Sequence, residues 1–290
     1  MQVHVNGVID GLALALLALG FQLVYLPTRI LFVALAGLYS LAPYVYLAAR
    51  SVVSNDVWCL AAAIGTTTLL ALGLEFANHA PLSRRRAGSG AHLVSSLGLY
   101  IVIVQAIALI WGQNVRNLRV GLDPTMAFAG TVLTQSQVLI GAVSCALTIG
   151  ILALLFATGF GLRLRALASN PSAFALFGHD ARPYRQAAFA MSGGFAAVVA
   201  LLNARDVGFA PGSGLPAILL AVVAVIVGGR GSFAGPVAAG VLLGVLRAEV
   251  VWRLSARWQD VVTFGILALF LLACPRGLAG RPLRAEAVTP

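Results

Sequence analysis

The sequence predicts an all-α integral membrane protein, a polytopic helical bundle in a single domain. The chain has 290 residues, of which 60% are hydrophobic and 10% are charged, and its mean hydropathy of +0.95 lies far above that of soluble domains. Apolar runs of about 20 residues, the length that spans a hydrocarbon layer as a helix, recur along the chain. The basic residues, all arginine, stand between these runs. The net charge of +10 therefore indicates positive-inside topology and contact with lipid headgroups, not nucleic acid.

The apolar runs define nine expected membrane segments. In chain order they are residues 8–26, 30–49, 57–76, 92–111, 138–158, 187–202, 215–227, 233–246 and 261–274. The first has no basic region before it, so we interpret it as a retained segment and not as a cleaved signal. The seventh and eighth are short and are separated by GGRGS. They indicate half-helices or a re-entrant pair, with the broken backbone buried in protein or facing a water-filled cavity, so we expect eight or nine segments.

The distribution of arginine predicts the orientation. Connections on one side of the segments hold 12 of the 19 basic residues, and an excess of arginine marks the cytoplasmic side. These residues are Arg29, Arg84, Arg85, Arg86, Arg163, Arg165, Arg182, Arg185, Arg230, Arg276, Arg281 and Arg284. The N-terminus is then outside and the C-terminus is cytoplasmic. If Pro27 only kinks one longer helix, the N-terminal side is reversed.

The longest polar interruption in the second half of the chain is residues 161–185. Asn170 is a good N-cap, Pro171 suits the first helical position, and Gly178 can adopt the left-handed conformation that ends a helix. These signals predict a helix of about two turns at 171–177, too short to cross a membrane.

The predicted short helix has an aromatic face, because Phe174 and Phe177 are three residues apart. Arginines flank it on both sides, which places it at the cytoplasmic surface. We interpret it as a docking element. The alternative is an amphipathic loop that lies on lipid headgroups.

Polar residues inside the segments bear on function, because an intramembrane polar group is costly unless it faces the bundle interior or a pathway. Gln105 either bonds a neighbouring helix or lines a pathway. The three threonines at 66–68 are expected to bond carbonyls of their own helix. Glu75 is expected to pair with one of the arginines at 84–86 rather than to carry protons. Asp206 and Glu249 stand beside arginines and are expected to be interface charges.

The stretch 227–244, VGGRGSFAGPVAAGVLLG, is rich in glycine. It formally contains a dinucleotide-binding pattern, which we reject because no soluble strand precedes it and no acidic partner follows. Its spacing does create small-residue faces, Gly231 with Gly235 and Gly240 with Gly244, that allow close approach of helices in lipid. A tight break between two closely packed half-helices is expected, and packing alone would explain it.

No motif indicates catalysis or a metal site. The histidines are scattered at segment ends, and the sequence has no HExxH, no paired carboxylates and no nucleophile elbow. A secondary transporter would usually need charged coupling groups at mid-membrane, and none is evident. Coupling energy must then come from outside the chain, through the docking helix.

Several stretches, in their order and spacing, carry a family resemblance. They are GLALALLALGFQLVY, LEFANHAPLSRRR followed by SLGLYIVIVQAIALIWG, GLRLRALASNPSAFALFG, GGRGSFAGPVAAGVLLG and CPRGLAG. Together they resemble the permease subunits of branched-chain amino-acid ABC importers, the Liv type, from about residue 11 to residue 280.

The resemblance implies that residues 161–178 hold a cytoplasmic coupling helix that fits a groove in a separate ABC ATPase subunit. With the two aromatic residues included, its site residues are Arg165, Ala166, Asn170, Pro171, Ala173, Phe174, Leu176, Phe177 and Gly178. The matching glycine-rich break comprises Gly228, Gly229, Gly231, Ser232 and Gly235. The resemblance also implies a second homologous permease in a heterodimer, an extracytoplasmic solute-binding protein, and a location in the bacterial inner membrane.

The chain departs from the family where such permeases have a polar Ala-His-Gly-Glu stretch. It reads Ala-Leu-Ala-Gly at 34–37 and continues with Tyr39 and Tyr44, which we take with Gln105 as pathway candidates. An acidic residue of the coupling helix is replaced by Ser172. The resemblance therefore predicts the importer class and leaves the substrate open.

We interpret residues 1–280 as one transmembrane permease domain with a coupling loop at 161–185, and residues 281–290 as a cytoplasmic tail. The expected function is to form half of the translocation pathway for branched-chain amino acids or related small polar solutes. The chain would have no cofactor and no catalysis of its own. Closure of the ATPases would move the helix at 171–177, docked through Phe174 and Phe177, and with it the fifth and sixth segments. The alternatives are a passive facilitator or channel, which needs no ATPase, and a non-transport membrane scaffold.

Overall fold

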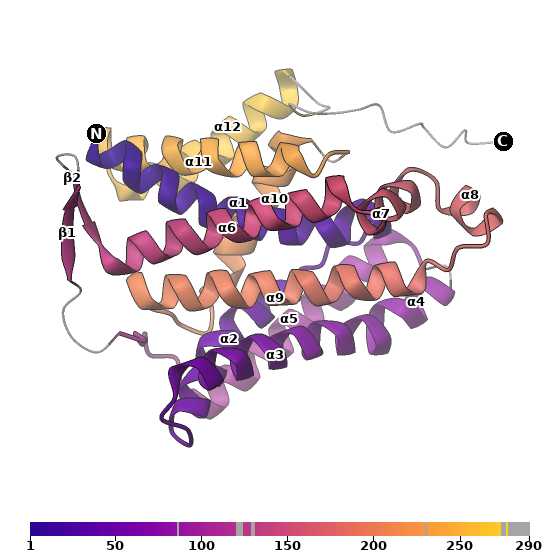
Figure 1. The fold of residues 1–290 in the computed structure, drawn as a ribbon, viewed down its shortest axis with the longest axis horizontal. Coiled ribbons are helices and arrows are strands. Elements are labelled where there is room, and N and C mark those ends of the chain that lie inside the picture. Colours follow the sequence, from indigo (N-terminus) through magenta and orange to yellow (C-terminus); the bar gives the residue numbers. More distant parts are fainter. Residues whose placement is uncertain (86, 120–123, 129–130, 230, 274–276, 278–290) are drawn as a thin grey trace.

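Each predicted membrane segment overlaps one long helix of the chain in the computed structural model (Figure 1). The structure describes residues 1–290 except 86, 120–123, 129–130, 230, 274–276 and 278–290. The segment helices are α1 (Gln2–Thr28), α2 (Leu35–Arg50), α3 (Asp56–Leu74), α5 (Ser89–Trp111), α6 (Gln135–Ala157), α9 (Arg182–Asp206), α10 (Gly214–Gly228), α11 (Ala234–Arg253) and α12 (Gln259–Ala273). The predicted fold class, an all-α polytopic membrane protein, is confirmed.

Shorter elements connect the segment helices. They are the π-helix η1 (Glu75–His79), α4 (Ala80–Arg84), the strands β1 (Thr125–Phe128) and β2 (Thr131–Thr134), α7 (Gly159–Ser169), α8 (Pro171–Leu176) and the 3₁₀ turn η2 (Ala256–Trp258). The two strands pair antiparallel in a small hairpin that differs from the expected all-helical chain.

Among the described residues, 6 helical spans are long and apolar enough to cross a membrane. They are α1, the continuous run from α3 to α4, α5, α6, α9 and α11. The eighth segment was expected to be short. It is instead a full span, because α11 continues for 20 residues to Arg253. The seventh, α10, is short at 15 residues.

Local capping fixes several helix boundaries. The Asn55 side chain accepts a hydrogen bond from the Val57 amide at the start of α3, and Thr134 and Gln137 form a capping box at the start of α6. Pro27 lies in the last turn of α1, which ends where Arg29 adopts the left-handed conformation with φ 57°. The first two segments are therefore separate helices, and the alternative of a single helix kinked at Pro27 is excluded.

The hairpin and α8 lie at opposite ends of the molecule. Figure 1 shows the N-terminus and the hairpin at one end of the long axis, and α7 and α8 at the other. The Gln2 side chain joins α1 to β2, since its amide donates to the Val132 carbonyl and accepts from the Val132 amide, each at 2.8 Å. We call this end of the bundle the hairpin end, and the other the α8 end.

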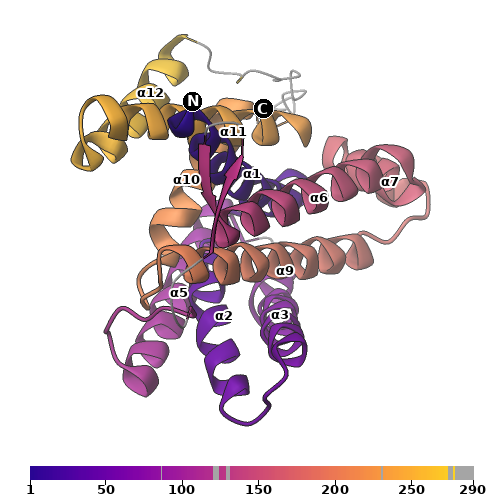
Figure 2. The ribbon, with the colours of Figure 1, turned by 60° about the vertical axis from the view of Figure 1, so that its left-hand side comes forward.

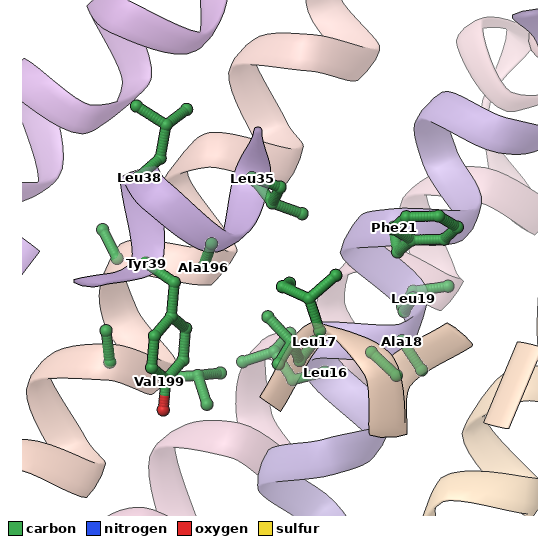
Figure 3. Close-up of a cluster of buried hydrophobic side chains, with 14 of the residues drawn as sticks. Leu16, Leu17, Ala18, Leu19, Phe21, Leu35, Leu38, Tyr39, Ala196 and Val199 are labelled. Carbon is green, nitrogen blue, oxygen red and sulfur yellow. The ribbon is translucent and has the colours of Figure 1, made fainter. Parts of the chain in front are cut away.

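The core of the bundle is built around α1. This helix contacts α6, α9, α10 and α11, and α9 in turn lies between the α2 and α3 pair and the α1 and α6 pair (Figure 2). Figure 3 shows the centre of this packing, where α1 side chains meet those of α2 and α9. The buried residues labelled there are Leu16, Leu17, Ala18, Leu19, Phe21, Leu35, Leu38, Tyr39, Ala196 and Val199.

The two most closely packed helices, α1 and α11, meet through small residues. A Cβ added at Gly240 would lie 2.6 Å from the Ala15 Cα atom, and one added at Gly244 would overlap the backbone of Gly11. The predicted face of Gly240 and Gly244 is thus confirmed as a helix contact. The predicted face of Gly231 and Gly235 is wrong, because Gly231 lies in the turn before α11 begins.

We expect Gly240→Ala to lower the free energy of unfolding by about 1–3 kcal/mol, because the added methyl group meets backbone atoms that cannot move aside. Thermal unfolding of the purified protein in detergent, followed by size exclusion, would measure this change. The matched control is Gly150→Ala in α6, where nothing lies within 4 Å of the added Cβ, so stability should be unchanged or slightly higher. Equal effects of the two substitutions would contradict the packing argument.

Candidate functional site

A cavity of about 650 Å³ lies between α1, α9, α10 and α11 near the hairpin end. It is formed by the first half of α1, the last turns of α9 and the second half of α11. Its polar lining residues are Asn6, Asp10, Tyr39, Asn203, Asp206, Ser213, Arg247 and Gln259. A volume of this size, with apolar walls and a few converging polar groups, is typical of small-molecule sites.

Three charged residues face this cavity. Asp10 interacts electrostatically with Asp206 and with Arg247. Arg247 also donates through Nη1 to Asp260 Oδ1 at 3.0 Å and to Thr263 Oγ1 at 3.1 Å. The cavity therefore combines two carboxylates with a guanidinium group that is held in place by Asp260 and Thr263.

Asp206, which we expected at an interface, does end α9, but it also lines the cavity. Asp10 was missed. A signal was available, because Asn6, Asp10 and Leu14 recur at four-residue spacing and so share one face of the first apolar run. Polar residues on one face of a buried helix indicate that this face meets water or a ligand.

Of the three predicted pathway candidates, only Tyr39 lines the cavity. Its hydroxyl oxygen accepts a hydrogen bond from Asn203 Nδ2 at 2.8 Å, and Figure 3 shows its ring beside Val199. Tyr44 is buried elsewhere, between the rings of Trp111 and Phe209.

Gln105, the third pathway candidate, is exposed on α5. It does not line the cavity. Its side-chain amide therefore faces the surroundings of the chain, either lipid or a partner subunit.

The helix predicted at the opposite end is present as α8. The Asn170 side chain accepts a hydrogen bond from the Ala173 amide at 2.9 Å, Pro171 occupies the first turn, and Gly178 is left-handed with φ 80°. These three features confirm the predicted cap, start and stop. The helix ends at Leu176, one residue before the predicted end.

The predicted aromatic face of α8 is wrong for Phe174. This side chain is only 4% exposed, and its ring contacts His179 at 5.1 Å and Tyr184 at 5.6 Å between centroids. Leu176 and Phe177 are instead 88% and 82% exposed. Phe174 thus anchors the loop, because the reversal at Gly178 folds the chain back over it, and the outward face belongs to Leu176 and Phe177.

Arg165, another predicted coupling residue, is half-buried and makes contacts within the chain. Its guanidinium lies 5.0 Å from the centroid of the Phe156 ring, and its Nε donates to the Gly161 carbonyl at 3.3 Å. This contact holds α7 against the end of α6.

The first turn of α9, which follows the α8 loop, is attached to η1 by a buried ion pair. Arg185 Nη2 lies 2.9 Å from Glu75 Oε1 and 3.1 Å from Ser83 Oγ. The Glu75 side chain is 4% exposed and that of Arg185 is 20% exposed. Glu75 thus forms an ion pair, as expected, but its partner is Arg185 and not a neighbouring arginine, because Glu75 points inward from a π-helix toward α9. Nearby, His79 and His92 are buried with their Nδ1 atoms 3.2 Å apart.

The glycine-rich break is a turn fixed to α1. Gly229 has φ 102°, and the Gly228 Cα is so close to the Gly235 backbone that no side chain fits between them. Ser232 Oγ accepts from the amides of Ala234 and Gly235, and the Ser232 carbonyl accepts from Gln22 Nε2 at 3.0 Å. These backbone groups of the break are thus satisfied inside the protein, as lipid surroundings require.

Comparison with known proteins places these features in a family. Residues 3–271 match the family described as "Branched-chain amino acid transport system / permease component". The chain is 28% identical to the high-affinity branched-chain amino acid transport system permease protein BraD of Pseudomonas aeruginosa, over 97% of this chain and 96% of that protein. It is 27% identical to the corresponding protein LivH of Escherichia coli, over 97% and 96%. It is 25% identical to a probable branched-chain amino acid transport permease of Methanocaldococcus jannaschii, over 92% and 88%. No solved structure matches the chain.

The ion pair of Glu75 and Arg185 can be tested by a double-mutant cycle. We expect Arg185→Met to lower the free energy of unfolding by about 3 kcal/mol, because it leaves a buried carboxylate without its cation. Adding Glu75→Gln should restore much of this loss. Both values would come from thermal unfolding in detergent.

The control for this cycle is Arg253→Met, which removes an exposed i,i+4 pair with Glu249 at 2.9 Å. It should change stability by at most about 1 kcal/mol. A double variant no more stable than Arg185→Met alone would contradict the buried pair.

Proposed function

The chain belongs to the family of branched-chain amino-acid transport permease components, and we propose that it forms half of the translocation pathway of an ATP-driven importer. The solutes would be branched-chain amino acids or related small polar molecules, as the names of the relatives suggest. The chain is an integral, multi-pass protein of the inner membrane. In this proposal it is non-catalytic, and ATP hydrolysis belongs to separate ABC ATPase subunits.

The observation that carries the proposal is the pair of exposed apolar side chains at the end of α8. Leu176 and Phe177 project from a capped helix in a polar, arginine-flanked loop. Burial of one such side chain is worth about 1.5–3 kcal/mol, so an exposed pair favours a partner surface. A groove on an ATPase subunit would cover it.

The fold offers a direct route from α8 to the cavity. Phe174 fixes α8 against Tyr184 in the first turn of α9, so the two helices move together. Helix α9 has 25 residues and is therefore about 37 Å long. Its far end supplies Asn203 and Asp206 to the cavity. A displacement of α8 by the ATPases would thus reposition cavity residues at the other end of a rigid rod.

The ion pair of Arg185 with Glu75 extends this route to α3, since it ties the first turn of α9 to η1. Alternating access would then be a movement between two packed arrangements of the bundle. Helices α9 and α3 would move together, and so would α6, which precedes the coupling loop. The contacts of α9 support this choice, because α9 touches α1, α2, α3 and α6.

We place the second permease subunit against α5. Gln105 is exposed there, with Ile101 and Leu109 on the same face and also exposed. An amide that faces hydrocarbon is costly, and a partner helix could satisfy it. This assigns Gln105 to an interhelical hydrogen bond between subunits.

In this proposal α8 and the tail at 281–290 are cytoplasmic, and the hairpin end faces the solute-binding protein. Residues 1–280 form one permease domain with the coupling loop at 161–185. The tail lies outside the described residues. The arginines on the α8 side support this orientation.

We expect Leu176→Ala/Phe177→Ala to reduce co-purification of ATPase subunits and solute-stimulated ATP hydrolysis at least tenfold, because two adjacent apolar anchors are lost. The measurement is affinity purification from the native host in mild detergent, followed by an ATPase assay. The matched control is Val52→Ala/Val53→Ala, which shortens two adjacent exposed residues near the hairpin end and should leave both readouts unchanged.

Phe174→Ala serves as a separate test of the corrected face. It should loosen the loop and reduce coupling while the ATPase still binds weakly, since this side chain faces the loop and not the partner. Purification of the chain with no ATPase, in the wild type as well as in the variants, would refute the importer proposal and favour the facilitator or the scaffold.

A further inference from the structure

We propose that the cavity between α1, α9 and α11 binds an α-amino acid as its zwitterion, with Asp10 and Asp206 receiving the ammonium group and Arg247 the carboxylate. This inference rests on the proposed function and adds a substrate-binding site within the permease itself. The neutral aliphatic side chain of the amino acid would lie against the apolar wall of the cavity.

The two aspartates create a place for a cation. Asp10 and Asp206 come from different helices, α1 and α9, and interact across the cavity. Like charges that share a cavity repel each other. Asp10 accepts no hydrogen bond from the part of the chain that the structure describes, and its side chain is exposed to the cavity. An ammonium group between the two carboxylates would relieve the repulsion and donate up to three hydrogen bonds.

Arg247 offers the complementary site for an anion. Its hydrogen bonds to Asp260 and Thr263 both use Nη1, and within the described residues no hydrogen bond uses Nε or Nη2. Guanidinium groups bind carboxylates in a bidentate manner. Asp260 is 72% exposed, so water screens its attraction to Arg247, and a ligand carboxylate inside the cavity can share the cation.

The wall between these charged groups is apolar. Its side chains include Leu14, Leu17, Ala217, Leu220 and Val251. An aliphatic side chain would gain about 25 cal/mol for each Å² that it buries there. The volume of about 650 Å³ exceeds what one small amino acid fills, so the cavity would select for the two charged groups and for an apolar side chain without fixing its length.

The position of the cavity suits a site that is coupled to α8. Asp206 ends α9, whereas Asp10 and Arg247 lie on α1 and α11, which pack against each other through small residues. Movement of α9 against this pair would separate Asp206 from Asp10 and so weaken the hold on the ammonium group. Release would then follow from the same displacement that the coupling loop transmits.

The test is binding of radiolabelled leucine to the chain, purified with its partner subunits, in the absence of ATP and of the solute-binding protein. Isocaproic acid, which lacks the ammonium group, and isoamylamine, which lacks the carboxylate, are the competitors. We expect saturable binding of leucine, with each competitor weaker by roughly tenfold or more, because each loses one charge-assisted contact.

Variants assign the contacts. Asp10→Asn and Arg247→Gln should each weaken leucine binding by roughly tenfold or more, and Arg247→Lys should recover part of the loss. Glu249→Gln is the matched control, because it removes one negative charge from the same part of α11 without lining the cavity. Each variant should remain monodisperse and keep its ATPase subunits, which separates loss of the site from loss of the fold.

Absence of saturable binding to the wild-type complex would overturn the inference, as would equal affinity for leucine and the two competitors. An equal effect of Asp10→Asn and Glu249→Gln would do the same. If binding fails although ATPase subunits co-purify and ATP drives leucine uptake, only this inference is refuted. If the ATPase subunits and the ATP-driven uptake are also absent, the proposed function is refuted as well.

Discussion

The close approach of α1 and α11 is the contact on which the rest of the bundle depends. Lipid provides no hydrophobic force between helices, so association relies on van der Waals packing and on the satisfaction of polar groups. Small residues at Gly11, Ala15, Gly240 and Gly244 let the two backbones meet. Because α1 is thereby surrounded by other helices, a polar side chain on its buried part must either form a hydrogen bond or face a cavity. Asp10 faces the cavity, and Gln22 binds the carbonyl of the glycine-rich turn.

The second organising element is α9, which joins the two ends of the molecule. Its first turn holds Tyr184 and Arg185, which anchor the loop of α8 and the π-helix of α3. Its last turn holds Asn203 and Asp206, which line the cavity. The hydrogen bond between Asn203 and Tyr39 also ties this last turn to α2. One helix thus carries contacts to both candidate regions, and a π-helical distortion at one of its partners is typical of functional sites.

The sequence predicts the helices and their caps, which depend on residues close together in the chain. It does not predict side-chain partners or cavities that depend on residues far apart in the chain. Apolar length located the segments, and the cap at Asn170 with Pro171 and Gly178 located α8, because these signals act within a few residues. The partner of Glu75 could not be predicted, since Arg185 is 110 residues away. Phe174 was misplaced because i,i+3 spacing gives a shared face only on a continuing helix, and α8 ends after Leu176. The cavity was missed because it assembles from helices far apart in the sequence, although the spacing of Asn6 and Asp10 contained a hint.

The glycine-rich turn also constrains how the protein is assembled during synthesis. Helix α10 has 15 residues, or about 22 Å, which falls short of a hydrocarbon layer of about 30 Å. Helix α10 is therefore too short to cross such a layer alone. In the described part of the turn that follows, the Ser232 carbonyl accepts a hydrogen bond from Gln22 of α1. Since α1 precedes α11 in the chain, the contact between them can form only after the helices in between have been synthesised. The contacts of α1 with α6 and α9 can form before α11 is made, so the closest helix pair of the bundle is completed after them.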